Sequence, residues 1–163
     1  MRTLLGIVVG CLFLIGAQQA KATPLTDDTL KSMLENLGYS VEVSGDKPPK
    51  DFKIHESAPD GSLDYTITFE LSAGTGSTLW IFAGLYSIPT DKPPPSSALL
   101  ALLAKNDEIG PVFFSYSTHN KLLYLNAPTP NVDITPQILR QKIKNFVSNM
   151  ASTYPLWNVK DWK

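Results

Sequence analysis

The sequence Asp64-Tyr65-Thr66-Ile67-Thr68-Phe69-Glu70-Leu71 decides the fold class, because its polar and apolar residues alternate along the whole stretch. Alternation with a period of two is typical of a β-strand with one buried face. Ala73-Gly74-Thr75-Gly76-Ser77 then predicts a hairpin turn, since this stretch lacks the Lys-Ser/Thr that a phosphate-binding loop requires.

Residues 79–88 predict the next strand, and this strand is apolar on both faces. Leu79, Ile81, Ala83 and Leu85 alternate with Trp80, Phe82, Tyr86 and Ile88. A strand of this kind is central, or something covers its second face. If neither the sheet nor a helix of the same chain covers that second face, it is an apolar patch for a partner.

Three other segments have helical periodicity. The first begins at Thr26-Asp27-Asp28 and ends at Gly38. The second covers residues 98–106, with Ser96 or Ser97 as its expected N-cap. Leucine or alanine occupies most of its circumference, so we expect this helix to be buried on more than one side. The third begins at Thr135-Pro136. Its expected buried stripe consists of Leu139, Ile143, Phe146, Val147 and Met150.

Shorter strands complete the pattern. Polar and apolar residues alternate over residues 39–43, which predicts a short strand. Residues 112–117 and 121–126 predict a hairpin, and Pro128 and Pro130 are expected to end its second strand. Phe52 and Ile54 predict a further brief strand. Without that brief strand, the predicted order is α-β-β-β-α-β-β-α. We therefore predict an α+β fold, an antiparallel sheet of about five strands flanked by three helices.

The first 22 residues predict a secretory signal peptide. Arg2 precedes an almost wholly apolar run, residues 3–16, and Ala20-Lys21-Ala22 is a small-x-small cleavage site. Val8-Val9-Gly10-Cys11 offers an alternative, a lipoprotein box acylated at Cys11. We favour cleavage after Ala22, because cleavage before Cys11 would follow a very short apolar run and leave an apolar N-terminus.

Cleavage after Ala22 would leave residues 23–163 as a single domain in the periplasm or outside the cell, with no stable membrane insertion. It removes two of the 14 Lys and Arg residues and none of the 15 Asp and Glu residues, so the net charge is about −3. A mildly acidic chain argues against binding nucleic acid. The mature chain would contain no cysteine, so its core must hold it together without disulfides.

Three stretches of sequence resemble the type III secretion chaperone-like superfamily, which includes Tir chaperones and YbjN-like proteins. They are residues 34–39 (LENLGY), residues 99–106 (LLALLAKN), and residues 122–125 (LLYL) leading into Ile134-Thr135 and Leu139. The resemblance covers residues 26–157. It implies a small sheet flanked by helices, often dimeric, that binds another polypeptide, with no catalytic activity and no cofactor.

No pattern of residues points to catalysis or to a metal. The two histidines, His55 and His119, are far apart in the sequence and lack ligand-spaced neighbours, so we interpret them as solvated or locally bonded. Asp27-Asp28 is explained by the start of a helix. We therefore predict no enzyme, no cofactor and no metal.

The predicted function is that of an exported protein- or peptide-binding domain that forms a homodimer. The motivating observation is the surplus apolar surface on residues 79–88 and 98–106. The alternative is a small-ligand carrier or an envelope enzyme that uses a cavity between helices and sheet, with a histidine and carboxylates converging there. The candidate partner-binding residues are Trp80, Phe82, Tyr86, Leu99, Leu100 and Leu103.

Overall fold

The computed structural model describes residues 23–89 and 93–162. The predicted signal peptide and Cys11 lie outside the described residues. The elements are, in chain order, α1 (Asp27–Asn36), β1 (Glu42–Ser44), β2 (Asp51–Ser57), β3 (Asp64–Leu71), β4 (Thr78–Ser87), α2 (Ser96–Ile109), β5 (Phe113–Ser117), β6 (Leu122–Pro130), α3 (Pro136–Ser152), α4 (Tyr154–Trp157) and the 3-10 turn η1 (Val159–Asp161).

The strands form one antiparallel sheet in the order β1-β2-β3-β4-β6-β5. The predicted α+β class is confirmed. The sheet has six strands rather than five, because the brief strand at Phe52 and Ile54 lengthens into β2 and joins the sheet. In addition to the three predicted helices, the structure contains the short helix α4 and the 3-10 turn η1 near the C-terminus.

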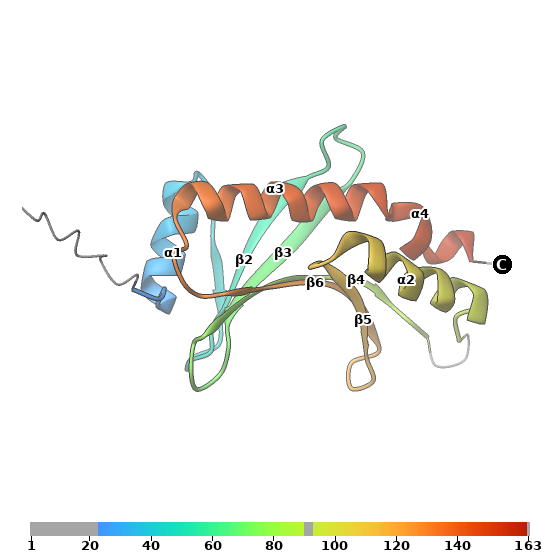
Figure 1. The fold of residues 1–163 in the computed structure, drawn as a ribbon, viewed down its shortest axis with the longest axis horizontal. Coiled ribbons are helices and arrows are strands. Elements are labelled where there is room, and N and C mark those ends of the chain that lie inside the picture. Colours follow the sequence, from blue (N-terminus) through green and yellow to red (C-terminus); the bar gives the residue numbers. More distant parts are fainter. Residues whose placement is uncertain (1–22, 90–92, 163) are drawn as a thin grey trace, which may run out of the picture.

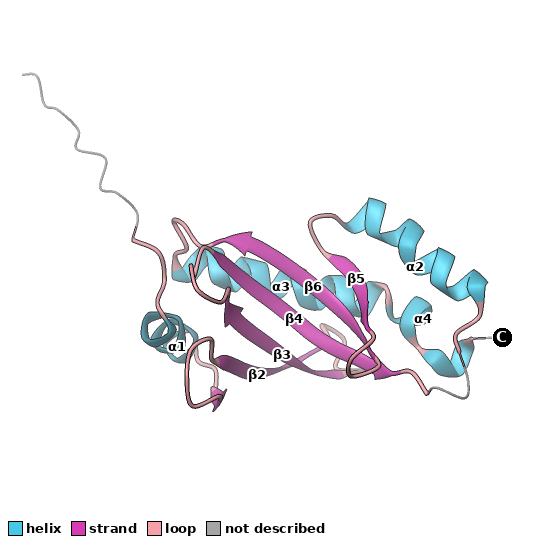
Figure 2. Ribbon diagram, turned by 90° about the horizontal axis from the view of Figure 1, so that it is seen from below, coloured by secondary structure: helices cyan, strands magenta, loops and turns pink. Residues whose placement is uncertain are grey.

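One long helix, α3, covers one side of the sheet. In Figure 1 α3 runs above the strands, α1 lies at one end of the sheet, and α2 and α4 lie at the other. Figure 2, the view from below, shows strands in front and α3 behind them, with α2 beside β5 rather than over the sheet. We call the side that α3 covers the helix face and the opposite side the open face. No helix within the described ranges covers the open face.

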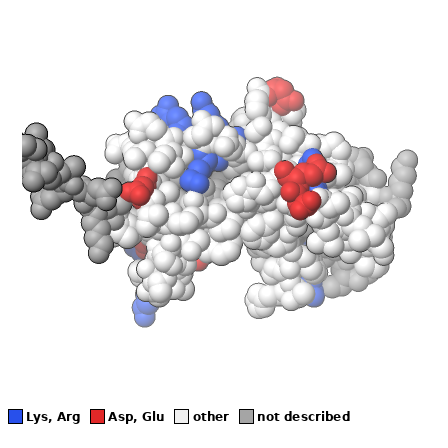
Figure 3. Space-filling view, viewed as in Figure 1, with Lys and Arg blue, Asp and Glu red and all other residues white. Residues whose placement is uncertain are grey.

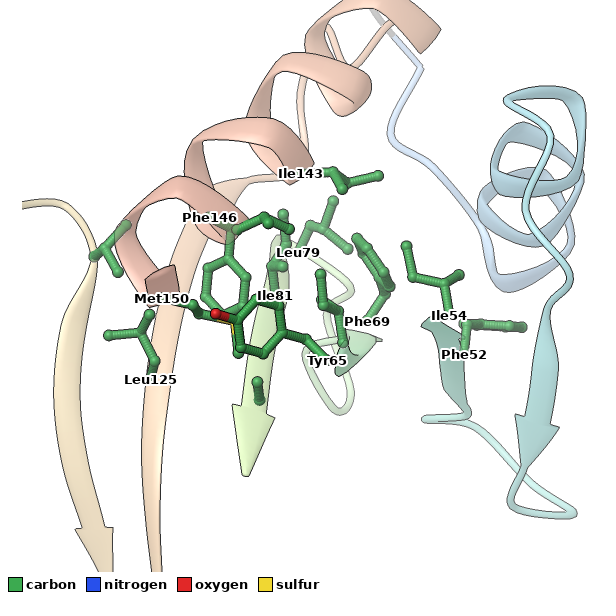
Figure 4. Close-up of a cluster of buried hydrophobic side chains, with 14 of the residues drawn as sticks. Phe52, Ile54, Tyr65, Phe69, Leu79, Ile81, Leu125, Ile143, Phe146 and Met150 are labelled. Atoms are coloured by element: carbon green, nitrogen blue, oxygen red, sulfur yellow. The ribbon is translucent and has the colours of Figure 1, made fainter. Parts of the chain in front are cut away.

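The core fills the space between α3 and the helix face. All five residues of the predicted α3 stripe are buried. Figure 4 shows Ile143, Phe146 and Met150 directed toward side chains of the sheet. The largest fully buried side chains in the core are Phe52, Phe69 and Phe146. Because the alternating side chains of β3 fill this layer, the sequence pattern of residues 64–71 is confirmed.

Local caps fix the predicted helix ends. The Thr26 side chain and Thr29 form a capping box at the start of α1, and Gly38 follows that helix with a φ of 97°. The Thr135 hydroxyl accepts a hydrogen bond from the Ile138 amide at the start of α3. These ends confirm the sequence prediction, since capping depends on nearby residues only.

Prolines do not end β6 where the sequence predicts. Pro128 lies opposite Trp80 and Pro130 lies opposite Thr78, so the strand continues to Pro130. Proline lacks an amide donor, and it is tolerated where that donor would point away from the neighbouring strand. β5 pairs with β6 only as far as Asn126. Beyond Asn126 the side of β6 that faces away from β4 has no neighbouring strand among the described residues. The two prolines lie in this part of β6, so their missing amides remove no hydrogen bond to β5.

The prediction that Tyr86 and Ile88 share a face with Trp80 is wrong. The pairing of β4 with β6 shifts between Gly84 and Tyr86. A bulge adds one residue to a strand and reverses the facing of every later side chain. Tyr86 therefore lies opposite the buried Leu123, and Ile88 is buried in the core.

The expectation that α2 is buried on more than one side is also wrong within this chain. Leu102 is its only buried residue. Leu100 and Leu103 keep 65% and 63% of their surface exposed. The reason is position, because α2 lies beside the edge strand β5 and against α4 instead of over the sheet. The helix also begins two residues earlier than predicted, with Pro95 as its N-cap residue.

Candidate partner-binding surfaces

The open face has a polar half and an aromatic half. Strands β1 to β3 carry mostly charged and hydroxyl side chains there: Glu42, Asp51, Lys53, His55, Asp64, Thr66, Thr68 and Glu70. Strands β4, β6 and β5 carry mostly aromatic and apolar ones: Trp80, Phe82, Phe113, Leu122, Tyr124 and Pro128. The boundary runs between β3 and β4, where Glu70 lies opposite Trp80 and Thr68 lies opposite Phe82.

A hollow of about 230 Å³ lies on this boundary. We call it the aromatic hollow, and its lining is Glu70, Trp80, Phe82, Tyr124 and Asn126. The rings of Phe82 and Tyr124 meet edge to face with their centroids 6.0 Å apart. Trp80 and Phe82 are half-buried. A sheet face that a single chain leaves with three aromatic side chains accessible is suited to contact with another molecule.

Gly84 contributes space beside this hollow. A side chain at Gly84 would meet the Tyr124 ring at 3.8 Å and Leu122 at 3.9 Å. These are ordinary van der Waals distances, so Gly84 lies directly beside the Tyr124 ring that meets Phe82. Asn126 is fixed from the other side, since its amide donates to the Ser115 hydroxyl at 2.8 Å. The shape of the hollow therefore depends on four strands, because β3, β4 and β6 line it and β5 holds Asn126 in place.

One wall of the hollow is acidic. Glu70 neighbours Asp51 of β2, since the pairing of Phe52 with Phe69 places the two carboxyl groups on adjacent strands. Burial, followed by the negative charge of Asp51, raises the pKa of Glu70 above its usual value. A carboxyl group that is partly desolvated beside a second carboxyl group favours a cation as its next neighbour.

A second apolar surface lies between α2 and β5. We call it the α2–β5 groove, and it has a volume of about 570 Å³. Leu99 and Leu103 line it, together with Phe114 and Tyr116 of β5. Leu100 is not among the lining residues and lies on the exposed side of α2. Tyr86 lines a separate hollow with Pro93–Pro95 and Trp162.

The structure brings some of the candidate residues together and separates others. Trp80 and Phe82 share the aromatic hollow, and Leu99 and Leu103 share the α2–β5 groove. Tyr86 is separated from Trp80 by the bulge in β4. Glu70 and Tyr124 also line the aromatic hollow, although neither was predicted from the sequence. The alternation of Leu122, Tyr124 and Asn126 with Leu123 and Leu125 signals that they share a face, but which strand lies next to them is not encoded in that pattern.

The cavity that a small-ligand carrier or enzyme would need lacks the expected residues. A hollow of about 280 Å³ lies between α3 and β6, and neither histidine and no carboxylate lines it. His55 is exposed on the open face, with its Nδ1 3.3 Å from the Thr66 hydroxyl and its Nε2 3.4 Å from Glu42. His119 is exposed in the hairpin turn between β5 and β6. Within the described residues, no three His, Cys, Asp or Glu side chains form a group that could hold a metal.

Known structures share this arrangement of helices and sheet. An uncharacterized protein from Methanothermobacter thermautotrophicus matches with a TM-score of 0.57 and 16% identity, over 84% of this chain and 98% of its own. A chain of the heterodimeric ExoU-SpcU complex from the type III secretion system of Pseudomonas aeruginosa matches with a TM-score of 0.51 and 15% identity, over 77% and 95%. A chain of the HopA1-SchA chaperone-effector complex matches with a TM-score of 0.51 and 11% identity, over 76% and 88%.

The fold is chaperone-like. At these identities the likeness establishes the fold alone. No protein-family model matches the sequence, and no curated protein sequence matches it. Among the described residues, the aromatic half of the open face and the exposed side of α2 are apolar surfaces that no other element covers. None of the helices in the described part of the chain is long and apolar enough to cross a membrane.

Proposed function

We propose that this chain is a non-enzymatic protein- or peptide-binding domain, an exported relative of the type III secretion chaperone-like superfamily. The observation that carries the proposal is the aromatic hollow on the open face. Its aromatic side chains belong to one contiguous surface, and partner-binding surfaces are enriched in such residues. A monomeric domain gains nothing from leaving them in water, since covering apolar surface is favourable by about 25 cal/mol per Å².

The chaperone-like fold supports the same proposal. One of the similar structures is a chaperone-effector complex and another is a heterodimeric complex of a type III secretion system. Both contain a chain of this fold beside another polypeptide. The proposal transfers polypeptide binding in general, and it assigns no particular effector to this chain.

A photo-crosslinking amino acid at position 80 tests the proposal. It is introduced in place of Trp80 in the full chain, expressed in the native host, and irradiated. We expect adducts of higher mass that contain a second polypeptide. The matched control is position 144, because Lys144 is exposed on the outer side of α3, away from the open face. Equal adduct formation at both positions, or none at position 80, would contradict the proposal.

We also propose export, with residues 1–22 as the cleaved signal peptide. N-terminal sequencing of the protein isolated from its host tests this directly. We expect the isolated chain to begin at Thr23 and to occur in the periplasmic or extracellular fraction. A chain that begins at Met1 and stays in the cytosol would refute export and leave the binding proposal intact.

The exposed side of α2 supports a third proposal, a homodimer. Leu99, Leu100 and Leu103 keep 39%, 65% and 63% of their surface exposed. An isologous contact between two copies would cover these leucines on both chains at once. The open face would remain accessible in such a dimer, since α2 lies beside β5 and not over that face.

A further inference from the structure

Two carboxyl groups and Trp80 occupy facing positions on three neighbouring strands of the open face. Asp51 of β2 neighbours Glu70 of β3, and Glu70 lies opposite Trp80 of β4. Side chains directly opposite on neighbouring antiparallel strands lie about 4.5–5.5 Å apart at their Cβ atoms. Glu70 is therefore the point at which the acidic wall meets the aromatic hollow.

No Lys or Arg of the described chain forms an ion pair with this acidic wall. The ion pairs of the described residues join Lys31 to Glu35 and Lys105 to Glu108, and His55 contacts Glu42 at 3.4 Å. Lys53 lies on the same face, opposite Thr68, and pairs with neither Asp51 nor Glu70. Figure 3 shows other basic side chains over α3, on the helix side of the molecule. The carboxyl groups beside Trp80 thus have no partner of opposite charge within hydrogen-bond distance.

A side chain that fits this place must be cationic and flat. A guanidinium group stacks on the face of an indole ring and pairs with a carboxylate through two parallel hydrogen bonds. Lysine offers a compact, strongly hydrated charge that does neither as well. An acidic segment is excluded by the charge of Asp51 and Glu70, and a purely apolar segment would leave the Glu70 carboxyl desolvated without compensation.

We propose that the open face binds an arginine-bearing segment of a partner protein, with the guanidinium stacked on Trp80 and paired with Glu70 beside Asp51. The inference rests on the proposed function and specifies the chemistry of the partner. The raised pKa of Glu70 agrees with it, because a bound cation would restore the charge stabilisation that burial removes. The neighbouring Phe82 and Tyr124 rings then accept an apolar residue that adjoins the arginine.

Titration with a defined peptide tests this inference. The probe is a blocked pentapeptide whose central arginine is flanked by leucine and phenylalanine, and the readout is the NMR signal of the Trp80 indole N–H. We expect a saturable shift with the arginine peptide. The control peptide has citrulline in place of arginine, a side chain of the same shape without the charge. We expect it to bind at least 10-fold more weakly. Equal binding of both peptides would overturn the inference.

Variants of the acidic wall give the matched comparison. Glu70→Gln keeps the size of the side chain and removes its charge. It should lower the affinity for the arginine peptide at least 10-fold and leave the affinity for the citrulline peptide unchanged. Asp64→Asn is the control, since Asp64 lies on the same face of β3 about 20 Å from Glu70. We expect Asp64→Asn to bind both peptides as the original chain does. Undiminished arginine binding by the folded Glu70→Gln variant would refute the role of Glu70.

The outcome separates this inference from the proposed function. Crosslinking at position 80 together with equal binding of both peptides would leave a protein-binding face that does not select arginine. Failure of crosslinking at position 80 would refute the proposed function itself. Glu70→Gln is expected to fold, because the raised pKa of Glu70 means that its ionised form is disfavoured in the folded chain.

Discussion

Asn131 holds together three segments that are distant in the sequence. Its side chain accepts a hydrogen bond from the Leu25 amide at 2.9 Å and donates to the carbonyl oxygens of Leu25 and Gly76, each at 2.8 Å. The residue is 1% exposed. It therefore ties the chain before α1 to the turn between β3 and β4, and a side chain without an amide would leave part-buried backbone groups without this partner.

We predict that Asn131→Ala lowers the free energy of unfolding by about 2–3 kcal/mol, because it removes three hydrogen bonds and leaves buried partners unsatisfied. Urea denaturation measures the change. Asn145→Ala is the control, since Asn145 is exposed on α3 and its loss should change stability by less than about 0.5 kcal/mol. Equal effects of the two substitutions would contradict this role for Asn131.

Tyr39 carries a pH-dependent contribution to stability. Its hydroxyl donates a hydrogen bond to the Glu56 carboxylate at 3.0 Å. Burial, followed by this contact, raises the pKa of Tyr39 to about 12. A pKa raised by folding means that the protonated phenol is stabilised in the folded chain. That stabilisation is complete below pH 10, the ordinary value for tyrosine, and is lost as the pH rises toward 12.

The expected result is a difference between the original chain and Tyr39→Phe that depends on pH. Because Tyr39 is only half-buried, solvent reduces the effect, and we expect about 1 kcal/mol in favour of the original chain at pH 8. This difference should shrink between pH 10 and 12. Urea denaturation at a series of pH values measures it. A constant difference across that range would show that the hydroxyl contributes nothing that titrates.

At the scale of elements, α2 protects the edge of the sheet. The Asn106 side chain accepts a hydrogen bond from the Phe114 amide at 2.6 Å and donates to the Phe114 carbonyl at 3.2 Å. In this way a helix side chain takes the place of a further strand beside β5. An unprotected edge strand offers its backbone groups to other chains and favours aggregation.

We expect Asn106→Ala to lower the free energy of unfolding by about 1–2 kcal/mol, since one backbone donor and one acceptor lose their partner. The exposed edge of β5 should also increase aggregation, which light scattering during storage measures. Asp107→Ala is the control, because Asp107 is the exposed next residue on α2. If both variants aggregate at the same rate, edge protection by Asn106 is wrong.

At the scale of the whole molecule, one layer of helices faces one sheet. Covering both faces of a sheet requires helices on both sides. Here α3 covers the helix face, while α2 lies beside the edge strand β5 and covers neither face. The open face and the outer side of α2 are left as the surfaces on which another chain could be accommodated.

The proposed dimer makes a prediction at this scale. Leu100→Glu should halve the mass measured by light scattering, because a charge at the centre of the contact opposes association. The helix content should stay unchanged, since 65% of Leu100 is exposed and the residue contributes little to the core. Ser148→Glu places the same charge on an exposed site of α3 and should leave the mass unchanged. An original chain that has the mass of a single copy at micromolar concentration would contradict the dimer.

Local patterns of residues were enough to predict the class of fold and most of its elements. The alternation of β3, the caps of α1 and α3, and the stripe of α3 depend on residues close together in the chain, and all are found as predicted. The two-sided apolar character of residues 79–88 also pointed to a surface in need of cover. Periodicity and capping are local properties, so a single sequence is enough to establish them.

Which of these surfaces come together depends on contacts between segments that are distant in the sequence. The bulge at Gly84 moves Tyr86 to the helix face, and the pairing of β6 with β4 brings Tyr124 beside Phe82. Glu70 gains its position beside Trp80 through the register of β3 with β4. Strand order and register are fixed by contacts between residues far apart in the chain. For that reason the aromatic hollow, and the acidic wall beside it, could not be derived from the local pattern of any one strand.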